Sequence, residues 1–308
     1  MTGWYPEVRR CLPDERRAAL DVLYRRMPEP LRPRLIDEAL AEERRGGVDL
    51  SGLWVAWRRG RVIGALLTQI LAGRSAGVWA PEVNSAWRRS ATAIALIRSA
   101  LNDLQSRDIR IVQALLDESS PRQASADLIA GGLPRITELV YLEIETSRRV
   151  LVGPRVPKMK WRPFSEETNA EFRSVLEETY FESLDMPELE GFRSLDDIIA
   201  GHKAGNRFIP ERWRLGRVVG EAKPGAVVLL SEVPDRNAWE IAYLGLNLEA
   251  RGRGLGLATL GHALDLARPC AARIELAVDI RNHPANWLYK TAGFRPYDHR
   301  EVYMAKLG

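Results

Sequence analysis

The sequence has few of the residues that build metal centres and disulfides. Its two cysteines, Cys11 and Cys270, lie in different halves of the 308-residue chain, and nothing in their spacing suggests a disulfide. The four histidines are scattered and have no cysteine partners at the spacing of metal ligands. We therefore expect separate thiols, no structural zinc and no catalytic metal.

Long apolar runs are also absent. A stretch such as Ala226 to Leu230 is far too short to cross a bilayer, and the arginine-rich start contains no apolar core of a signal peptide. These absences exclude a membrane-spanning protein and predict a cytoplasmic one without a membrane partner.

Lysine is missing before Lys158, so arginine supplies nearly all the positive charge of the first half. The formal net charge of +4 invites a nucleic-acid interpretation, but acidic residues are interleaved throughout and no basic stripe alternates with aromatics. We expect no nucleic-acid partner. The sequence leaves open whether the chain is a monomer or a homodimer.

With 45% apolar and 28% charged residues, the chain is long enough for two domains that each bury a core. The two halves show the same order of strand-like and helix-like segments, which predicts an α/β (α+β) fold of two similar domains, each with a mixed, mostly antiparallel sheet flanked by helices. Two prolines, Pro154 and Pro157, interrupt a polar stretch between the halves. The predicted domains are residues 1–148 and 159–308, joined by a linker at 149–158.

One segment carries chemistry. A strand-like run ending near Leu248 is followed by Arg251-Gly252-Arg253-Gly254-Leu255-Gly256 and then by a helix. Glycines at a helix start leave backbone N–H groups open to an anion, and a diphosphate is the natural ligand. The spacing fits neither a P-loop, which needs a lysine, nor the Gly-x-Gly-x-x-Gly dinucleotide motif.

The pattern Arg-x-x-Gly-x-Gly after a strand resembles the coenzyme A motif of the GNAT acyltransferase superfamily. A second segment, from Asn282 through Ala285, Tyr289 and Gly293 to Phe294, is similar to another motif of that family in order and spacing. The resemblance covers roughly residues 158–308. It implies an N-acetyltransferase with acetyl-coenzyme A as co-substrate and a small-molecule or peptide amine as acceptor.

The resemblance also implies which residues bind the coenzyme. The strand that ends near Leu246 would separate from its neighbour, Ile274 to Val278, and admit the pantetheine arm. The residues expected to contact the coenzyme are Leu246, Asn247, Leu248, Arg251, Gly252, Arg253, Gly254, Leu255, Gly256, Asn282, Ala285 and Tyr289.

Direct transfer needs an acid for the leaving thiolate and a base for the amine. Tyr289 is the predicted acid, with a core tyrosine as the alternative interpretation. Glu240 is the predicted base, with solvent or a plain surface role as alternatives. Asn282 is also suited to cap the helix that follows it.

The first half has a weaker version of the same motifs. Around Trp87 to Ala93 it keeps arginines but has Ala91 and Ala93 in place of glycines, and Leu128 stands opposite Tyr289. We predict a degenerate, non-catalytic GNAT-like domain there, with an unrelated α/β domain as the alternative.

The loop from Phe181 to Phe192 holds four carboxylates and no basic residue, which suits a cationic amine as well as plain solvation. Two other functions stay open: a non-catalytic acyl-coenzyme A sensor or scaffold, and a protein or peptide N-acetyltransferase that docks its target through the first half.

Overall fold

The computed structural model describes residues 6–84, 86, 88–205 and 207–308. The chain forms two compact units. Unit 1 consists of Met1–Ile136 together with Glu301–Gly308, and unit 2 consists of Thr137–Arg300.

Unit 1 is a mixed sheet with helices on both faces. Its strands follow the order β1-β2-β3-β4-β6-β13, with β5 beside β3, and the pair β4–β6 is parallel. The elements of unit 1 are β1 (Glu7–Arg10), β2 (Leu53–Arg58), β3 (Arg61–Leu71), β4 (Ser75–Val78), β5 (Glu82–Val83), β6 (Ile111–Leu116), the end of β13 (Arg295–Lys306), α1 (Arg16–Leu23), α2 (Leu31–Arg45), α3 (Arg89–Ser106) and α4 (Arg122–Gly131).

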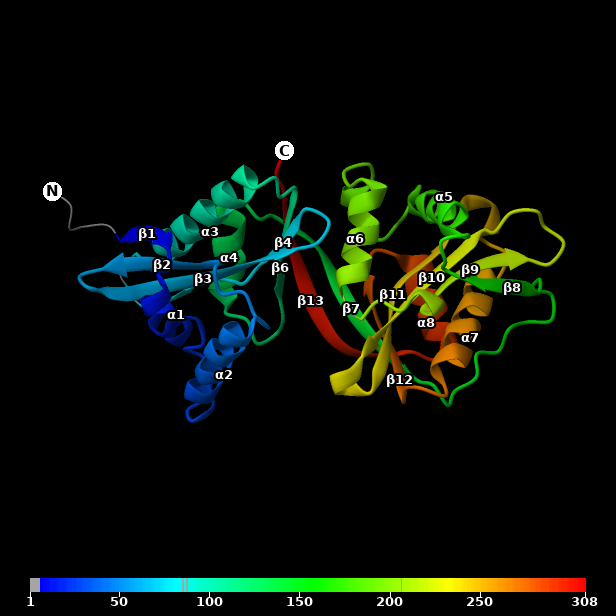
Figure 1. Ribbon diagram of the computed structural model, residues 1–308, viewed down its shortest axis with the longest axis horizontal. Helices are drawn as coiled ribbons and strands as arrows, with labels where there is room; N and C mark the ends of the chain where they lie inside the picture. The colour runs from blue at the N-terminus through cyan, green and yellow to red at the C-terminus, as the bar shows by residue number, and fades with distance from the viewer. Residues whose placement is uncertain (1–5, 85, 87, 206) are drawn as a thin grey trace. The chain divides into compact units, whose positions relative to one another are not determined.

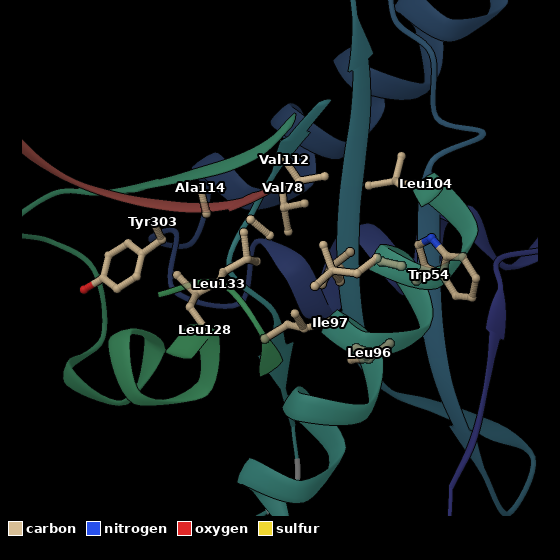
Figure 2. Packing of buried hydrophobic residues seen from close by; sticks show 14 of the residues in the cluster. Trp54, Val78, Leu96, Ile97, Leu104, Val112, Ala114, Leu128, Leu133 and Tyr303 are labelled. Atoms are coloured by element: carbon tan, nitrogen blue, oxygen red, sulfur yellow. The ribbon is translucent and has the colours of Figure 1, made fainter. Parts of the chain in front are cut away.

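The alternation along β2 explains this layering. Leu53 and Val55 join a buried cluster with α1 and α2, whereas Trp54 and Ala56 join a second cluster with α3 and α4. Successive side chains of a strand point to opposite faces, so one apolar strand supplies both layers. Figure 2 shows the second cluster, including Tyr303 of β13 beside Leu128 and Leu133.

Unit 2 repeats this plan. Its strands follow the order β7-β12-β11-β10-β9-β8, and β11–β12 is the parallel pair. The elements are β7 (Arg135–Glu145), β8 (Met159–Pro163), β9 (Trp213–Val218), β10 (Ala226–Val233), β11 (Ala238–Leu246), β12 (Arg273–Asp279), α5 (Asn169–Tyr180), α6 (Leu195–Gly205), α7 (Leu255–Ala267) and α8 (His283–Ala292).

Along β10, Val227 and Leu229 pack in a cluster with α5 and α6, and Val228 and Leu230 pack in another with α7 and α8. The predicted fold class, a mixed α/β fold of two similar domains, is confirmed by this organisation and by the comparisons reported below.

Each unit contains one strand from the other half of the sequence. Residues Leu139–Glu145 of β7 pair with β12 in unit 2, and Glu301–Lys306 of β13 pair with β6 in unit 1. The compact units therefore divide between residues 136 and 137 and between residues 300 and 301. The domain boundaries at 148 and 159 that the sequence indicated stay a prediction. No helix within the described residues has both the length and the apolar character needed to cross a membrane.

Candidate active site

Unit 2 contains an open wedge between β11 and β12. The two strands pair only where Ala238–Glu240 faces Arg273–Glu275. Beyond this point β11 continues to Leu246 along β10, and β12 continues to Asp279 along β7. The facing edges of β11 and β12 are therefore without a strand partner, and the predicted separation of these strands is confirmed.

A bulge lies in β11 just beyond the closed end of the wedge. The register with β10 passes from Leu230↔Ile241 to Leu229↔Tyr243, so Ala242 is an extra residue. Bulges twist a strand and redirect its backbone groups, which suits a strand that leaves its neighbour to border a site.

The N-terminus of α7 lies just after β11, across a glycine-rich turn. Gly252 and Gly254 adopt left-handed φ angles of 72° and 76°, which side chains disfavour. A Cβ at Gly254 would stand 2.7 Å from Val156 Cγ2. The N-cap of α7 is Gly254, which has no side chain to bond the N–H groups of the first turn. The turn thus presents uncapped N–H groups, which is the arrangement an anionic diphosphate requires.

The Arg251 side chain is bonded to the protein backbone and is not available to bind an anion. Its guanidinium donates to four backbone carbonyls at 2.9–3.3 Å, those of Leu246, Thr179, Phe181 and Glu182. This clamp ties the end of α5 to the end of β11. Any contact of Arg251 with a ligand would therefore come from its backbone.

Beside the turn lies a cavity of about 320 Å³. Arg253 lines it and donates to Glu221 Oε1 at 2.6 Å, so a carboxylate of the protein already pairs with its charge. Asn247 lines it as well, and its side chain accepts from Ala250 N at 3.1 Å and donates to Glu178 at 2.9 Å. Two further residues predicted to contact the coenzyme, Leu248 and Leu255, border the same cavity.

The start of α8 is capped by Asn282, whose Oδ1 accepts from Ala285 N at 3.2 Å. The capping role suggested by the sequence is therefore confirmed. Contact of either residue with a ligand stays a prediction.

Tyr289 of α8 packs in the cluster between α7, α8 and the sheet, with 7% of its surface exposed. Among the residues that the structure describes, its hydroxyl has no hydrogen-bond partner. Burial raises the pKa of Tyr289, and the negative charge of Asp185 adds to this effect. The hydroxyl is thus a protonated donor without a partner among the described residues, near enough to Asp185 and to Tyr243 of β11 for both to raise its pKa.

Glu240 lies at the closed end of the wedge, in the last paired row, where its partner is Glu275. Glu275 is 4% exposed, forms an ion pair with Arg236 at 3.1 Å and accepts from the Tyr297 hydroxyl at 3.3 Å. Two carboxylates therefore stand side by side at this point, and the sequence had indicated only one.

Asp185 and Asp279 were not predicted as individual site residues. Asp185 belongs to the acidic loop after α5, and its Oδ1 accepts from Asp279 N at the end of β12 at 3.1 Å. The loop had been recognised from its composition. The contact with β12 joins positions almost a hundred residues apart, and no local pattern indicates it.

Unit 1 has an internal ion pair near the corresponding turn. Arg89 Nη1 donates to Asp127 Oδ2 at 2.5 Å, and Asp127 is 2% exposed. The N-cap of α3 is Arg88, where α7 has Gly254, so Ser90 and not Ala93 takes the place of Gly256 in the first turn. Leu128 lies four residues before the C-cap of α4, as Tyr289 does in α8, and is completely buried. Trp87, at the start of the predicted motif, lies outside the described residues. A carboxylate of the protein thus neutralises the arginine at this turn.

Comparisons with known proteins agree with this geometry. Residues 167–294 match the acetyltransferase (GNAT) family model. A mycothiol acetyltransferase of Beutenbergia cavernae is 44% identical over 66 residues, which is 21% of this chain and 22% of that enzyme. The matched part is therefore less than a quarter of the curated relative's length.

Two solved structures resemble the whole chain. A GCN5-related N-acetyltransferase from Sphaerobacter thermophilus aligns with 98% of this chain and 95% of its own, at 16% identity and a TM-score of 0.62. A tandem GNAT protein from the clavulanic acid biosynthesis pathway aligns with 98% of both chains, at 19% identity and a TM-score of 0.52. Residues 167–294 therefore belong to the acetyltransferase (GNAT) family, and the chain as a whole has the fold of tandem GNAT proteins.

Proposed function

We propose that unit 2 transfers the acetyl group of acetyl-coenzyme A to a primary amine by direct transfer within a ternary complex. The observation that carries the proposal is the wedge between β11 and β12, which leads to the uncapped N-terminus of α7. Tyr289 of α8 packs in the cluster that α7 and α8 form with the same sheet. Membership of residues 167–294 in an acetyltransferase family supports the same class of reaction.

The residues at the wedge fit the coenzyme. Residues Ile241–Leu246 of β11 have an edge without a strand partner, whose N–H and C=O groups suit the amides of the pantetheine arm. The first turn of α7 suits the diphosphate because its N–H groups lack a cap and because Gly254 keeps side-chain atoms away from the turn. We assign Leu246 to the arm and Gly252 to Gly256 to the diphosphate.

The transfer requires two proton movements. The neutral amine attacks the thioester carbonyl, a C–N bond forms, and the C–S bond breaks. We assign Tyr289 as the acid that protonates the leaving thiolate, since its raised pKa keeps the hydroxyl protonated at neutral pH. We assign Glu240 as the base that receives the proton of the amine through water, since it lies on β11 at the closed end of the wedge.

Replacing the acid tests the assignment. In Tyr289→Phe we expect kcat for coenzyme A release to fall by roughly 10²-fold, the size of effect typical for general acid catalysis, while the Kd for acetyl-coenzyme A stays within about twofold. The measurement is thiol release with a panel of small amines and a lysine-containing peptide. Tyr303→Phe is a matched control, because it removes a tyrosine hydroxyl from unit 1.

An unchanged kcat in Tyr289→Phe would remove Tyr289 from the mechanism. If the wild-type protein binds acetyl-coenzyme A but releases no thiol with any amine of the panel, the chain is a sensor or scaffold and not a transferase.

A further inference from the structure

The loop between α5 and α6 is fastened to the end of β12 by two hydrogen bonds that run in opposite directions. Asp279 N donates to Asp185 Oδ1 at 3.1 Å, and Met186 N donates to Asp279 Oδ2 at 3.3 Å. The next residue, Ile280, bonds its N–H to Glu138 O at the border of β7. Since successive N–H groups of a strand alternate in direction, Asp279 N points away from β7 and toward the wedge. The Asp185 carboxylate therefore lies at the edge of the wedge.

A buried network holds this loop in place. Asp279 is completely buried and accepts from Thr137 Oγ1 at 2.7 Å and from Arg281 Nη2 at 2.7 Å. Arg281 also makes a bidentate pair with Glu188 of the loop, at 2.6 and 3.0 Å. Bidentate arginine–carboxylate pairs fix geometry as well as charge, so the position of Asp185 is set by β7, β12 and the loop together.

Asp185 also borders a cavity of about 300 Å³ under the loop. The rest of the lining is mixed. Glu177, Glu190 and Arg193 are charged, and the apolar or aromatic side chains are those of Tyr180, Phe181, Met186, Pro187, Leu189, Leu195 and Ile198. Asp185 is an exposed residue, but desolvation by the surrounding protein raises the pKa of its carboxyl, and the charge of Asp279 adds to this effect. It is one of three carboxylates in the pocket lining, and the one that is bonded to the end of β12.

The pocket and the wedge meet at Asp185. The Asp185 carboxylate contributes to the raised pKa of Tyr289 and of Tyr243, whose pKa burial raises to about 12, so its charge reaches both hydroxyls. Tyr289 is the proposed acid, and Tyr243 belongs to the part of β11 that borders the wedge. A group bound to Asp185 would thus lie between the cavity under the loop and the Tyr289 hydroxyl, which is the proposed acid.

We propose that Asp185 is the specificity-determining residue of unit 2, where it binds the ammonium group of an acceptor whose apolar body fills the pocket between α5 and α6. The acceptor class is a primary amine on an aromatic or aliphatic chain. The inference rests on the proposed acetyl transfer and adds the recognition of the amine to it.

The test compares a cation with its neutral isostere. The probes are 2-phenylethylamine and 2-phenylethanol, titrated calorimetrically into the protein in the presence of coenzyme A, so that no turnover is needed. We expect the wild-type protein to bind the amine at least about tenfold more tightly than the alcohol, because hydrogen bonds to charged groups are the stronger ones. In Asp185→Asn, this preference should be lost while alcohol binding changes by less than about twofold.

Asn is chosen because its Oδ1 still accepts from Asp279 N, so the loop keeps its contact and loses only charge. Glu182→Gln is the matched control, since it removes one carboxylate from the same loop outside the pocket lining. An undiminished Kd for acetyl-coenzyme A in each variant shows that unit 2 remains folded.

Equal affinity of the wild-type protein for both probes, or an unchanged preference in Asp185→Asn, overturns the assignment. The two proposals fail separately. Amine binding that depends on Asp185 without any thiol release would contradict the transfer and retain the recognition. Thiol release whose amine KM is the same in Asp185→Asn and wild type would retain the transfer and contradict the recognition.

Discussion

Arg89 and Asp127 form an ion pair in unit 1, at the start of α3 and within α4. The side chains are 19% and 2% exposed, so neither charge is well solvated, and each depends on the other. The pair lies at the start of α3, the helix that corresponds to α7 of unit 2, and α3 lacks a side-chain cap as α7 does. We propose that Asp127 supplies from the protein itself the negative charge for which unit 2 would use a ligand.

Removing the carboxylate should therefore destabilise unit 1. Asp127→Asn leaves Arg89 without its counter-charge, and we expect a loss of about 3–5 kcal/mol in the free energy of unfolding, the usual cost of breaking a buried pair. The matched control is Asp37→Asn, which breaks a pair with Arg17 whose side chains are 62% and 60% exposed and should cost less than about 1 kcal/mol. Urea unfolding of both variants measures the difference, and equal losses would contradict a structural role for Asp127.

The sequence predicted the residues whose structural role depends only on neighbours within a few positions along the chain. Gly254 and Asn282 could be assigned because a helix start needs a particular backbone or cap within a few residues. Asp185, Asp279 and Glu275 could not, because their partners lie on other elements and only the folded sheet brings them together. The role of the Arg251 side chain was missed for the same reason, since three of its four acceptors lie about 70 residues earlier in the chain.

Strand β7 shows that the division of the chain into two units depends on strand pairing, which no local sequence pattern reveals. Seven of its residues pair with β12, and Val140, Leu142 and Ile144 enter the core under α7 and α8. The sequence predicted a strand at Ile136 to Ile144 and counted it in the first half, within 1–148. The compact unit that contains the strand is unit 2, and local patterning could not show this because an alternating strand fits the edge of either similar sheet.

Two fragments test this assignment. We expect residues 137–300 to unfold cooperatively on heating and residues 159–308 to lack a stable fold. Burial of three aliphatic side chains contributes roughly 1.5–3 kcal/mol each, and their sum is comparable with the whole stability of a domain. Circular dichroism during heating gives the readout. A fragment 159–308 as stable as 137–300 would show that β7 is dispensable and that the sequence boundary describes a self-sufficient domain.

At the scale of the whole molecule, two units of one fold differ at the position of the ligand. Unit 2 has left-handed glycines, an uncapped α7 and a tyrosine hydroxyl without a partner among the described residues. Unit 1 has Arg88 at the N-cap of α3, an internal ion pair at the first residue of that helix, and a buried leucine at the place of Tyr289. We propose that unit 2 alone binds the coenzyme and that unit 1 supports the fold of the chain.

A calorimetric titration of the 308-residue chain with acetyl-coenzyme A tests whether unit 2 alone binds the coenzyme. We expect saturable binding at one site per chain. Gly254→Ala should weaken it at least about tenfold, because a Cβ at this left-handed position would meet Val156 at 2.7 Å and displace the N–H groups of the turn. Gly261→Ala, in the same helix, meets its nearest neighbour at 3.9 Å and should bind as the wild type does. Two sites per chain, no saturable heat, or equal affinity of Gly254→Ala and the wild type would contradict the account.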